Sequence, residues 1–170
     1  MHHLTRYILH YRGYTLIYVG MQGSYSGTLT CVKNSFNPIV HLNHSSGRCL
    51  GVSMQSYLGT ILIYNVYAFN EHKDCIVIWQ DLHQQPLFDG VICGDFNVVI
   101  DSSDCTTRAA TMTCAEKQNW QLVAQMHDLR DAWSMLHTHT AFTFHSQAHR
   151  KAWARLDRCY LSRVEWCVLL

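Results

Sequence analysis

The segment 60–67 constrains the fold of this chain more than any other. It reads Thr-Ile-Leu-Ile-Tyr-Asn-Val-Tyr, so nearly every side chain is β-branched, aliphatic or aromatic, which is typical of a strand covered on both faces. Apolar residues then recur at a roughly helical spacing from Cys75 to Leu82, and this pattern ends near Pro86. A short apolar run, 91–93, follows and ends in Gly94. We therefore expect a central strand, a helix that covers its sheet, and a second strand.

Shorter patterns on either side predict the rest of the fold. Runs at 14–19 and 29–32 favour strands and are separated by a turn-rich break at 20–27, which predicts antiparallel strands joined by hairpins. A second helix is expected from Ala115 to about His127, with Trp120, Val123 and Ala124 along the side that carries His127. Strand-like pieces recur at 141–144 and 156–161. This mixture predicts an α/β (α+β) layered sandwich with mixed, mainly antiparallel sheets.

Composition limits the classes of protein to consider. The length of 170 residues and the 48% of hydrophobic residues suit one domain spanning 1–170. With 13 basic and 12 acidic side chains, overall charge does not indicate a nucleic-acid or membrane partner. The eight cysteines include no Cys-x-x-Cys pair, which favours free thiols in an intracellular setting, cytoplasm or nucleus. No secretory signal and no membrane span are expected, because no run of about 18 apolar residues occurs.

Chemistry-bearing residues stand directly after the second strand, in Gly94-Asp95-Phe96-Asn97. A rigid sheet can hold such side chains while the following loop opens them to a substrate. The carboxylate of Asp95 could bind a divalent cation or take a proton from water, and the amide of Asn97 could donate to a phosphate oxygen. Because Asp and Asn at a strand end more often form turns, the tetrapeptide alone does not establish a site.

Four other segments occur in a fixed order around this tetrapeptide: Asn-Val-Tyr-Ala-Phe-Asn at 65–70, Leu-Arg-Asp-Ala-Trp at 129–133, Phe-Thr-Phe at 142–144 and Arg-Leu-Asp-Arg at 155–158. The ordered set resembles the endonuclease/exonuclease/phosphatase superfamily. Within it, the set resembles the apurinic-type endonuclease domain that precedes reverse transcriptase in long-interspersed-element retroelements. The resemblance covers roughly residues 14–162.

The resemblance implies catalytic roles for four residues. Tyr67 would lie beside the scissile phosphate, and Asp95 would bind the metal and activate water or protonate the leaving oxygen. Asn97 would hold the phosphate, and Asp157 would orient a catalytic histidine. Such a set is chemically coherent, because phosphodiester cleavage requires charge neutralisation, an aligned water and a stabilised leaving oxygen.

The resemblance also implies a substrate surface, a cofactor and partners. Asn65, Thr143 and Arg155 would contact the substrate. The cofactor would be Mg²⁺ or Mn²⁺, and the substrate a nucleic acid, DNA, with no membrane partner. In a full-length ancestor, the reverse transcriptase domain of the same element would be the partner.

Two departures from the family pattern bear on activity. The family takes a metal-binding glutamate from a strand near its N-terminus, but no Asp or Glu precedes Glu71 here. The family also ends in Ser-Asp-His, whereas no histidine follows Asp157. We therefore expect a domain truncated at both ends with little or no nuclease activity. The alternative is a non-catalytic retroelement relic with at most weak nucleic-acid binding.

Several other features have competing interpretations. The basic residues between Arg150 and Arg163 could contact DNA or form a solvated face. The histidines between His137 and His149 could suggest zinc, but exposed loop histidines are the preferred interpretation, because no cysteine or carboxylate lies among them. We expect Trp79, Trp120 and Trp133 in the core. Trp153 could stack on a base, although packing in the core or at an interface is favoured.

Overall fold

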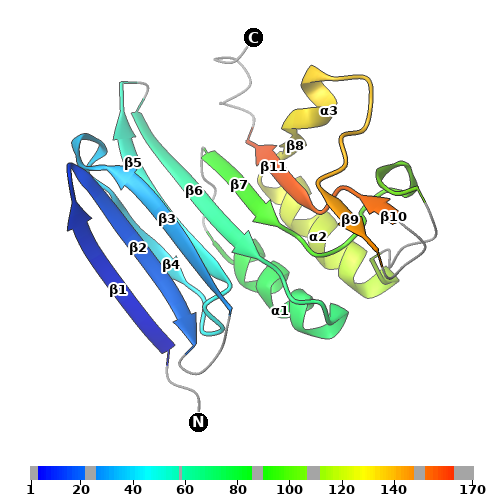
Figure 1. The fold of residues 1–170 in the computed structure, drawn as a ribbon, viewed down its shortest axis with the longest axis horizontal. Helices are drawn as coiled ribbons and strands as arrows, with labels where there is room; N and C mark the ends of the chain where they lie inside the picture. The colour runs from blue at the N-terminus through cyan, green and yellow to red at the C-terminus, as the bar shows by residue number, and fades with distance from the viewer. Residues whose placement is uncertain are drawn as a thin grey trace.

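The computed structural model describes residues 4–21, 26–57, 59–85, 90–106, 112–147 and 152–162. These form three layers (Figure 1): a three-stranded sheet, a six-stranded sheet and a layer of helices. The three-stranded sheet has the order β1 (Leu4–Tyr11), β2 (Tyr14–Met21) and β3 (Gly27–Lys33), all antiparallel. The predicted hairpins in the first part of the chain are confirmed.

The six-stranded sheet carries the predicted central strand. Its order is β4 (Ile39–Asn43), β5 (Cys49–Ser56), β6 (Gly59–Tyr67), β7 (Gly90–Asp95), β11 (Asp157–Leu161) and β8 (Arg130–Asp131). Only β6 and β7 run parallel, and α1 (His72–His83) connects them. The mixed, mainly antiparallel α/β architecture is therefore confirmed.

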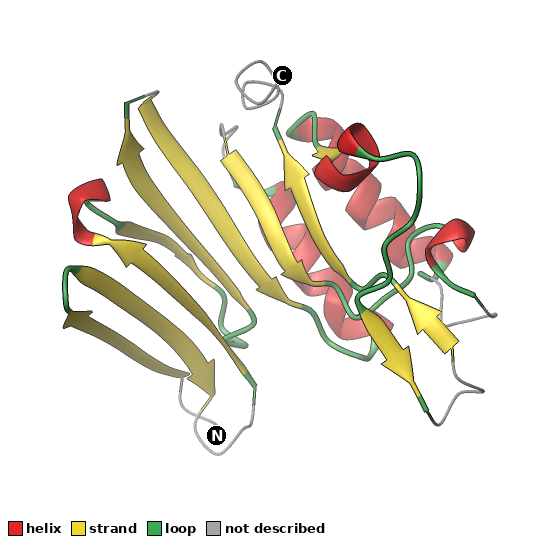
Figure 2. Ribbon diagram, turned by 45° about the horizontal axis from the view of Figure 1, so that its top comes forward, coloured by secondary structure: helices red, strands yellow, loops and turns green. Residues whose placement is uncertain are grey.

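Helices cover one face of this sheet. Figure 2 shows α1 and α2 (Cys114–Met126) side by side behind the strands, and α3 (Ala132–Leu136) near β8. Both long helices coincide with the predicted segments: α1 is longer than its predicted segment, and α2 begins and ends one residue earlier than predicted. Among the described helices, none is long and apolar enough to cross a membrane.

An aromatic cluster forms the core between the sheet and the helices. The Trp79 ring stacks on Phe96 with centroids 5.3 Å apart, and Trp120 lies 5.2 Å from Trp79 and 4.8 Å from Tyr160. All four side chains are buried. The core therefore holds Phe96, and with it the backbone of the loop that follows β7.

A second core lies between the two sheets. It consists of Ile17, Val19, Val32, Leu50 and Val52, all buried. The six-stranded sheet is thus covered by helices on one face and partly by the three-stranded sheet on the other.

Two local predictions, for 141–143 and for Trp133, are wrong, and Trp153 does not lie in the core. Residues 141–143 are not a strand, and β9 (Phe144–Ser146) instead pairs with β10 (Ala152–Ala154) in a short hairpin. Trp133 is only half-buried and packs on His137, with ring centroids 3.9 Å apart. Trp153 is 45% exposed and stacks on His145. Both tryptophans cover part of their apolar surface by packing against histidine rings instead of packing in the core.

Candidate active site

Three of the predicted catalytic residues meet at one end of the six-stranded sheet. Tyr67 ends β6 and is the parallel-strand partner of Asp95, which ends β7. Asp157 begins β11 and lies directly opposite Asp95 in the antiparallel pair. Because side chains alternate between the faces of a strand, all three share the face that points away from α1 and α2. Tyr64, Ile92 and Tyr160 occupy the helix-covered face.

A tight turn places the fourth residue. Asn97 has a positive φ of 51°, and its backbone N–H donates to Asp95 Oδ1 at 2.8 Å. Its side-chain Nδ2 donates to the carbonyl oxygen of Ala68 at 2.7 Å. One N–H of the Asn97 amide is therefore used to join the ends of β6 and β7.

Gly94 allows the close approach of these two strands. Its φ is +134°, and a Cβ at this position would lie 2.0 Å from the carbonyl oxygen of Val66. Only glycine fits a backbone contact of this kind without displacement. The glycine of the tetrapeptide thus has a steric reason to precede Asp95.

The environment of Asp95 disfavours its charge. Burial raises the pKa of this carboxyl, and the neighbouring carboxylate of Asp157 adds to the increase, while the hydrogen bond from the Asn97 N–H opposes it. Two facing carboxylates suit a cation such as Mg²⁺, which keeps several waters and needs one or two protein carboxylates. Within the described ranges, no group of three or more His, Cys, Asp or Glu side chains is placed to hold a metal. Asp95 and Asp157 therefore fit a hydrated cation, but not a complete protein cage.

Thr143 positions the first residues of β11. Its Oγ1 accepts hydrogen bonds from the backbone N–H of Leu156 at 3.1 Å and of Asp157 at 3.0 Å. The Thr143 side chain is itself exposed. The threonine predicted at the substrate surface thus also fixes the backbone that carries Asp157.

The predicted substrate residue Asn65 lies between the two sheets. Its Nδ2 donates to the carbonyl oxygen of Leu29 at 3.0 Å and to Thr30 Oγ1 at 3.2 Å. Asn65 shares the face of Tyr67 but is two residues further from the strand end. In this structure its amide therefore joins β6 to β3.

Arg155 belongs to a buried ion-pair network. Its Nε lies 2.9 Å from Asp104 Oδ1 and its Nη2 lies 2.7 Å from Asp131 Oδ2, while Arg158 pairs with the same two carboxylates at 2.6 and 3.3 Å. Both arginines are 5% exposed. Burial alone would raise the pKa of Asp104, but the hydrogen bonds and charges of Arg158 and Arg155 lower it overall. The Arg155 guanidinium is thus paired with two carboxylates.

This network changes the interpretation of the basic segment. Arg155 and Arg158 form neither a solvated strip nor an exposed DNA-contact strip, because Asp104 and Asp131 neutralise them internally. Arg150, Lys151 and Arg163 lie outside the described residues.

Arg48 is a site residue that the sequence did not indicate. Its Nη1 donates to the carbonyl oxygens of Tyr67 at 3.3 Å and Ala68 at 3.0 Å, and its guanidinium lies 4.6 Å from the ring centroid of Tyr67 and 4.4 Å from that of Phe69. No carboxylate of the described residues lies within 4.0 Å of it. Only the register of β5 beside β6 brings it here, since it lies 19 residues from Tyr67.

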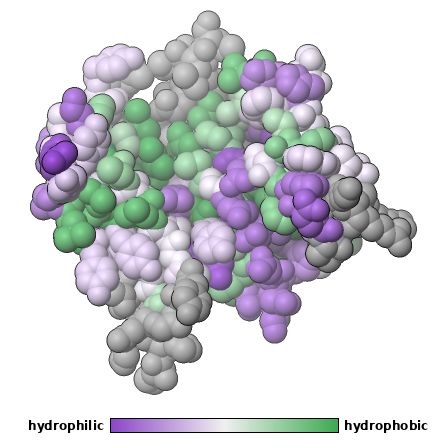
Figure 3. Space-filling model, viewed as in Figure 1, coloured by the Kyte–Doolittle hydropathy of each residue, from purple (hydrophilic) through white to green (hydrophobic). Residues whose placement is uncertain are grey.

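A hollow of about 430 Å³ adjoins Asp157. It is lined by Ala132, Trp133, Leu136, His137, Ala141, Thr143, Arg155, Asp157, Arg158 and Cys159. Figure 3 shows apolar side chains gathered over the middle of the β6–β7 region and hydrophilic ones around the strand ends.

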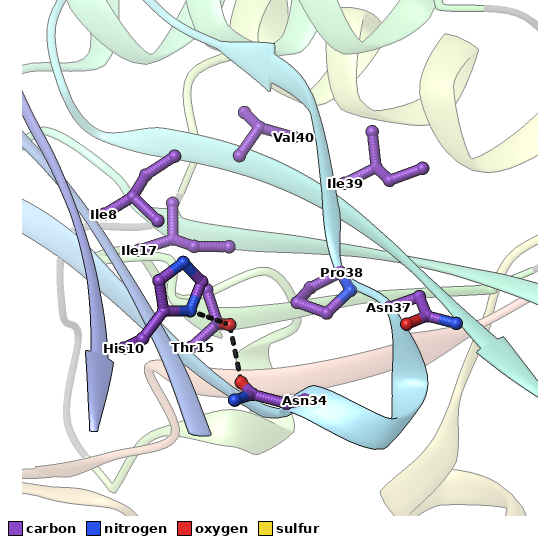
Figure 4. A pocket seen from close by; sticks show the side chains of 9 residues that line it. All are labelled: Ile8, His10, Thr15, Ile17, Asn34, Asn37, Pro38, Ile39 and Val40. Carbon is purple, nitrogen blue, oxygen red and sulfur yellow. Dashed lines mark hydrogen bonds between the residues drawn. The ribbon is translucent and has the colours of Figure 1, made fainter. Parts of the chain in front are cut away.

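A second hollow, of about 650 Å³, opens near the opposite edge of the six-stranded sheet, beside β4 (Figure 4). Its apolar wall includes Ile8, Ile17 and Ile39. Its polar side is a chain of hydrogen bonds in which Thr15 Oγ1 lies 3.0 Å from His10 Nδ1 and donates to Asn34 Oδ1 at 2.7 Å. Because two strands separate β4 from β7, this hollow is remote from Asp95.

No protein-family model matches the sequence, and no curated protein matches it. Several solved structures match the structure of this chain. The 3′ phosphatase NExo from Neisseria, bound to a product DNA hairpin, matches with 16% identity and a TM-score of 0.60, over 89% of this chain and 68% of NExo. The endonuclease domain of TRAS1, a telomere-specific non-LTR retrotransposon, matches with 12% identity and a TM-score of 0.59, over 92% of this chain and 70% of that domain.

The AP endonuclease LMAP from Leishmania major matches with 14% identity and a TM-score of 0.63, over 89% of this chain and 62% of LMAP. At such identities the likeness shows the fold. It is a layered α/β sandwich, as the sequence predicted.

Proposed function

We propose that this chain derives from a divalent-metal-dependent phosphodiesterase that cleaves nucleic acid, and that Asp95, Asn97, Tyr67 and Asp157 are its catalytic residues. The observation that carries the proposal is the meeting of Tyr67, Asp95 and Asp157 on one sheet face, with Asn97 tied to Asp95 by the turn. The sequence motif order and the fold of the similar structures support the same assignment.

Each side chain has a role that its position allows. The Tyr67 hydroxyl donates to a phosphate oxygen at the end of β6. Asp95 takes a proton from the attacking water or returns one to the leaving oxygen, and burial, which raises the pKa of this carboxyl, makes it a stronger base than an ordinary aspartate. Asn97 steadies the phosphate with the amide hydrogen that Ala68 does not accept.

Asp95, with Asp157 opposite, would hold the Mg²⁺ or Mn²⁺ that supplies the positive charge for the phosphate. Thr143 keeps Asp157 in place through the backbone. In a retroelement setting, DNA would be the substrate and a reverse transcriptase domain the partner on the same polypeptide.

We further propose that the 170-residue chain by itself has low activity. No carboxylate precedes Glu71 and no histidine follows Asp157, so two members of the family set have no counterpart. Loss of one member of a cooperating set commonly lowers the rate by several orders of magnitude.

A nicking assay on supercoiled plasmid with Mg²⁺ tests both statements. The full chain should nick slowly, Asp95→Ala should abolish the residual activity, and Asp101→Ala, which alters an exposed loop carboxylate, should leave it unchanged. Efficient nicking by the unmodified chain would contradict the low activity. Nicking that survives in Asp95→Ala would contradict the assigned site.

A non-catalytic nucleic-acid binder is the second candidate. It is favoured by one observation: no third metal ligand accompanies Asp95 and Asp157 within the described residues. Binding to duplex DNA that weakens steeply with salt, without Mg²⁺-dependent nicking, would support it. Absence of both binding and nicking would contradict both candidates.

A further inference from the structure

Two cysteines face each other beside the candidate active site. Cys93 on β7 and Cys159 on β11 are directly opposite residues of the antiparallel pair, and both are free and partly exposed. They stand two residues from Asp95 and Asp157 along the same strands. The period of two places all four side chains on one sheet face.

The hydrogen-bond pattern gives this pair the geometry of a disulfide. The N–H of Phe96 donates to the carbonyl oxygen of Leu156, and the N–H of Ser162 donates to that of Gly90. Hydrogen-bonded pairs alternate with non-hydrogen-bonded pairs along an antiparallel ladder, so Cys93 and Cys159 form a non-hydrogen-bonded pair. Its Cα atoms are about 4.5 Å apart, which lies within the range that a disulfide spans, about 4.4–6.8 Å.

Other cysteines of the described chain lack this arrangement. In the strand ladders Cys31 lies opposite Leu16 and Cys49 opposite Val66. Cys75 is buried in α1 and its Sγ donates to the carbonyl oxygen of Phe69. A specific redox reaction at Cys93 and Cys159 is therefore distinguishable from general thiol oxidation.

We propose that Cys93 and Cys159 are a reversible dithiol site that closes to a cross-strand disulfide by exchange with a low-molecular-weight disulfide such as glutathione disulfide. One thiolate attacks a glutathione sulfur, which forms a mixed disulfide and releases one glutathione thiolate. The second cysteine thiolate then attacks the protein sulfur of the mixed disulfide and releases the other glutathione. The two cysteines lose two electrons and two protons, and glutathione disulfide is reduced to two thiols.

Closure of the disulfide has a direct structural effect, because the two cysteines stand opposite each other on neighbouring strands. The new bond ties β7 to β11 next to the Asp95 and Asp157 pair, so it fixes the spacing of those carboxylates.

Peptide mapping by mass spectrometry tests the proposal. The full chain is equilibrated with glutathione disulfide at pH 7.5 and pH 9, alkylated and digested without reduction. We expect a linked peptide pair containing Cys93 and Cys159, which dithiothreitol removes.

Variants supply the controls. Cys31→Ser, which alters an exposed cysteine, should keep the link, whereas Cys93→Ser and Cys159→Ser should each abolish it. The proposal is overturned if the unmodified, folded chain yields no such link at either pH, or if Cys31 and Cys114 are found linked to Cys93 as often as Cys159 is. The mapping of the unmodified chain decides the matter even if a serine variant does not fold.

Discussion

Asp95 and Asp157 lie directly opposite each other on neighbouring strands, on the sheet face turned away from the helices. Like charges on opposed residues are unfavourable, and Asp95 is also partly buried. The pair is therefore a local cost to stability at neutral pH, and such a cost is typical of a place where a cation or substrate can bind.

Replacement of Asp95 by Asn should stabilise the chain at pH 7. The folded-state pKa of Asp95 is raised above its ordinary value of 3.8, so the folded state holds this proton more tightly than the unfolded state. The free energy of unfolding of the unmodified chain should fall as the pH rises from 3.8 through the folded-state pKa. Urea unfolding of Asp95→Asn at several pH values should lack this decline.

Asp101→Asn is the matched comparison, because that carboxylate is exposed, and it should change the free energy of unfolding by less than about 0.5 kcal/mol. Equal stability of Asp95→Asn and the unmodified chain at pH 7 would show that the opposed carboxylates carry no cost.

Gly94→Ala should be much more destabilising than Gly59→Ala. Both glycines have a positive φ, +134° and +119°, but a Cβ at Gly59 meets nothing within 4 Å, whereas at Gly94 it meets the Val66 carbonyl oxygen. Backbone strain should cost about 1–3 kcal/mol at either position, and the clash should add about 1–3 kcal/mol at Gly94. Urea melts of the two variants measure the difference directly, and similar losses would refute the close approach of β6 and β7.

Removal of the Arg48 guanidinium should loosen the end of β6. Arg48→Met keeps an apolar side chain beside Tyr67 and Phe69 but loses the hydrogen bonds to two carbonyl oxygens, at a cost of roughly 1–3 kcal/mol. Amide exchange at Tyr67 and Ala68 should accelerate. Arg12→Met is the control, because Arg12 is an exposed residue above the Tyr11 ring, and unchanged exchange in Arg48→Met would contradict the role of Arg48.

Asp104→Asn should destabilise the chain by about 3–5 kcal/mol, because it leaves buried arginines without full neutralisation. The lowered folded-state pKa of Asp104 contributes stability that is present above its ordinary value of 3.8 and is lost as the pH falls through the folded-state value. Acid titration followed by circular dichroism should therefore show the unmodified chain and Asp104→Asn converging in stability at low pH. A constant difference down to pH 2 would argue against this origin.

The fold was predictable from the sequence because its signals are local. The apolar runs of β6 and β7 and the helical spacing of α1 each lie within one segment, and their order indicated a layered α/β sandwich. The error at 141–143 arises where alternating aromatic residues imitate a strand. There, the Thr143 hydroxyl instead accepts hydrogen bonds from the backbone N–H groups of Leu156 and Asp157.

Site residues within one contiguous motif were predictable from the sequence. Site residues that are brought together only by the pairing of distant segments were not. Asp95 and Asn97 stand in one tetrapeptide, but the surroundings of Arg155 depend on Asp104 and Asp131, which come from distant segments. Arg48 reaches Tyr67 only through the pairing of β5 with β6. A single sequence gives no measure of such pairings.

The carbonyl oxygen of Ala68 accepts from both Arg48 and Asn97, and it belongs to the main chain. No side-chain replacement can delete it, so alanine scanning would pass over the atom on which the two donors converge. Only a change in the backbone itself, such as an ester in place of the following peptide bond, would weaken that acceptor. This backbone acceptor therefore resists point mutation, and a mutational survey would not detect its role in the site.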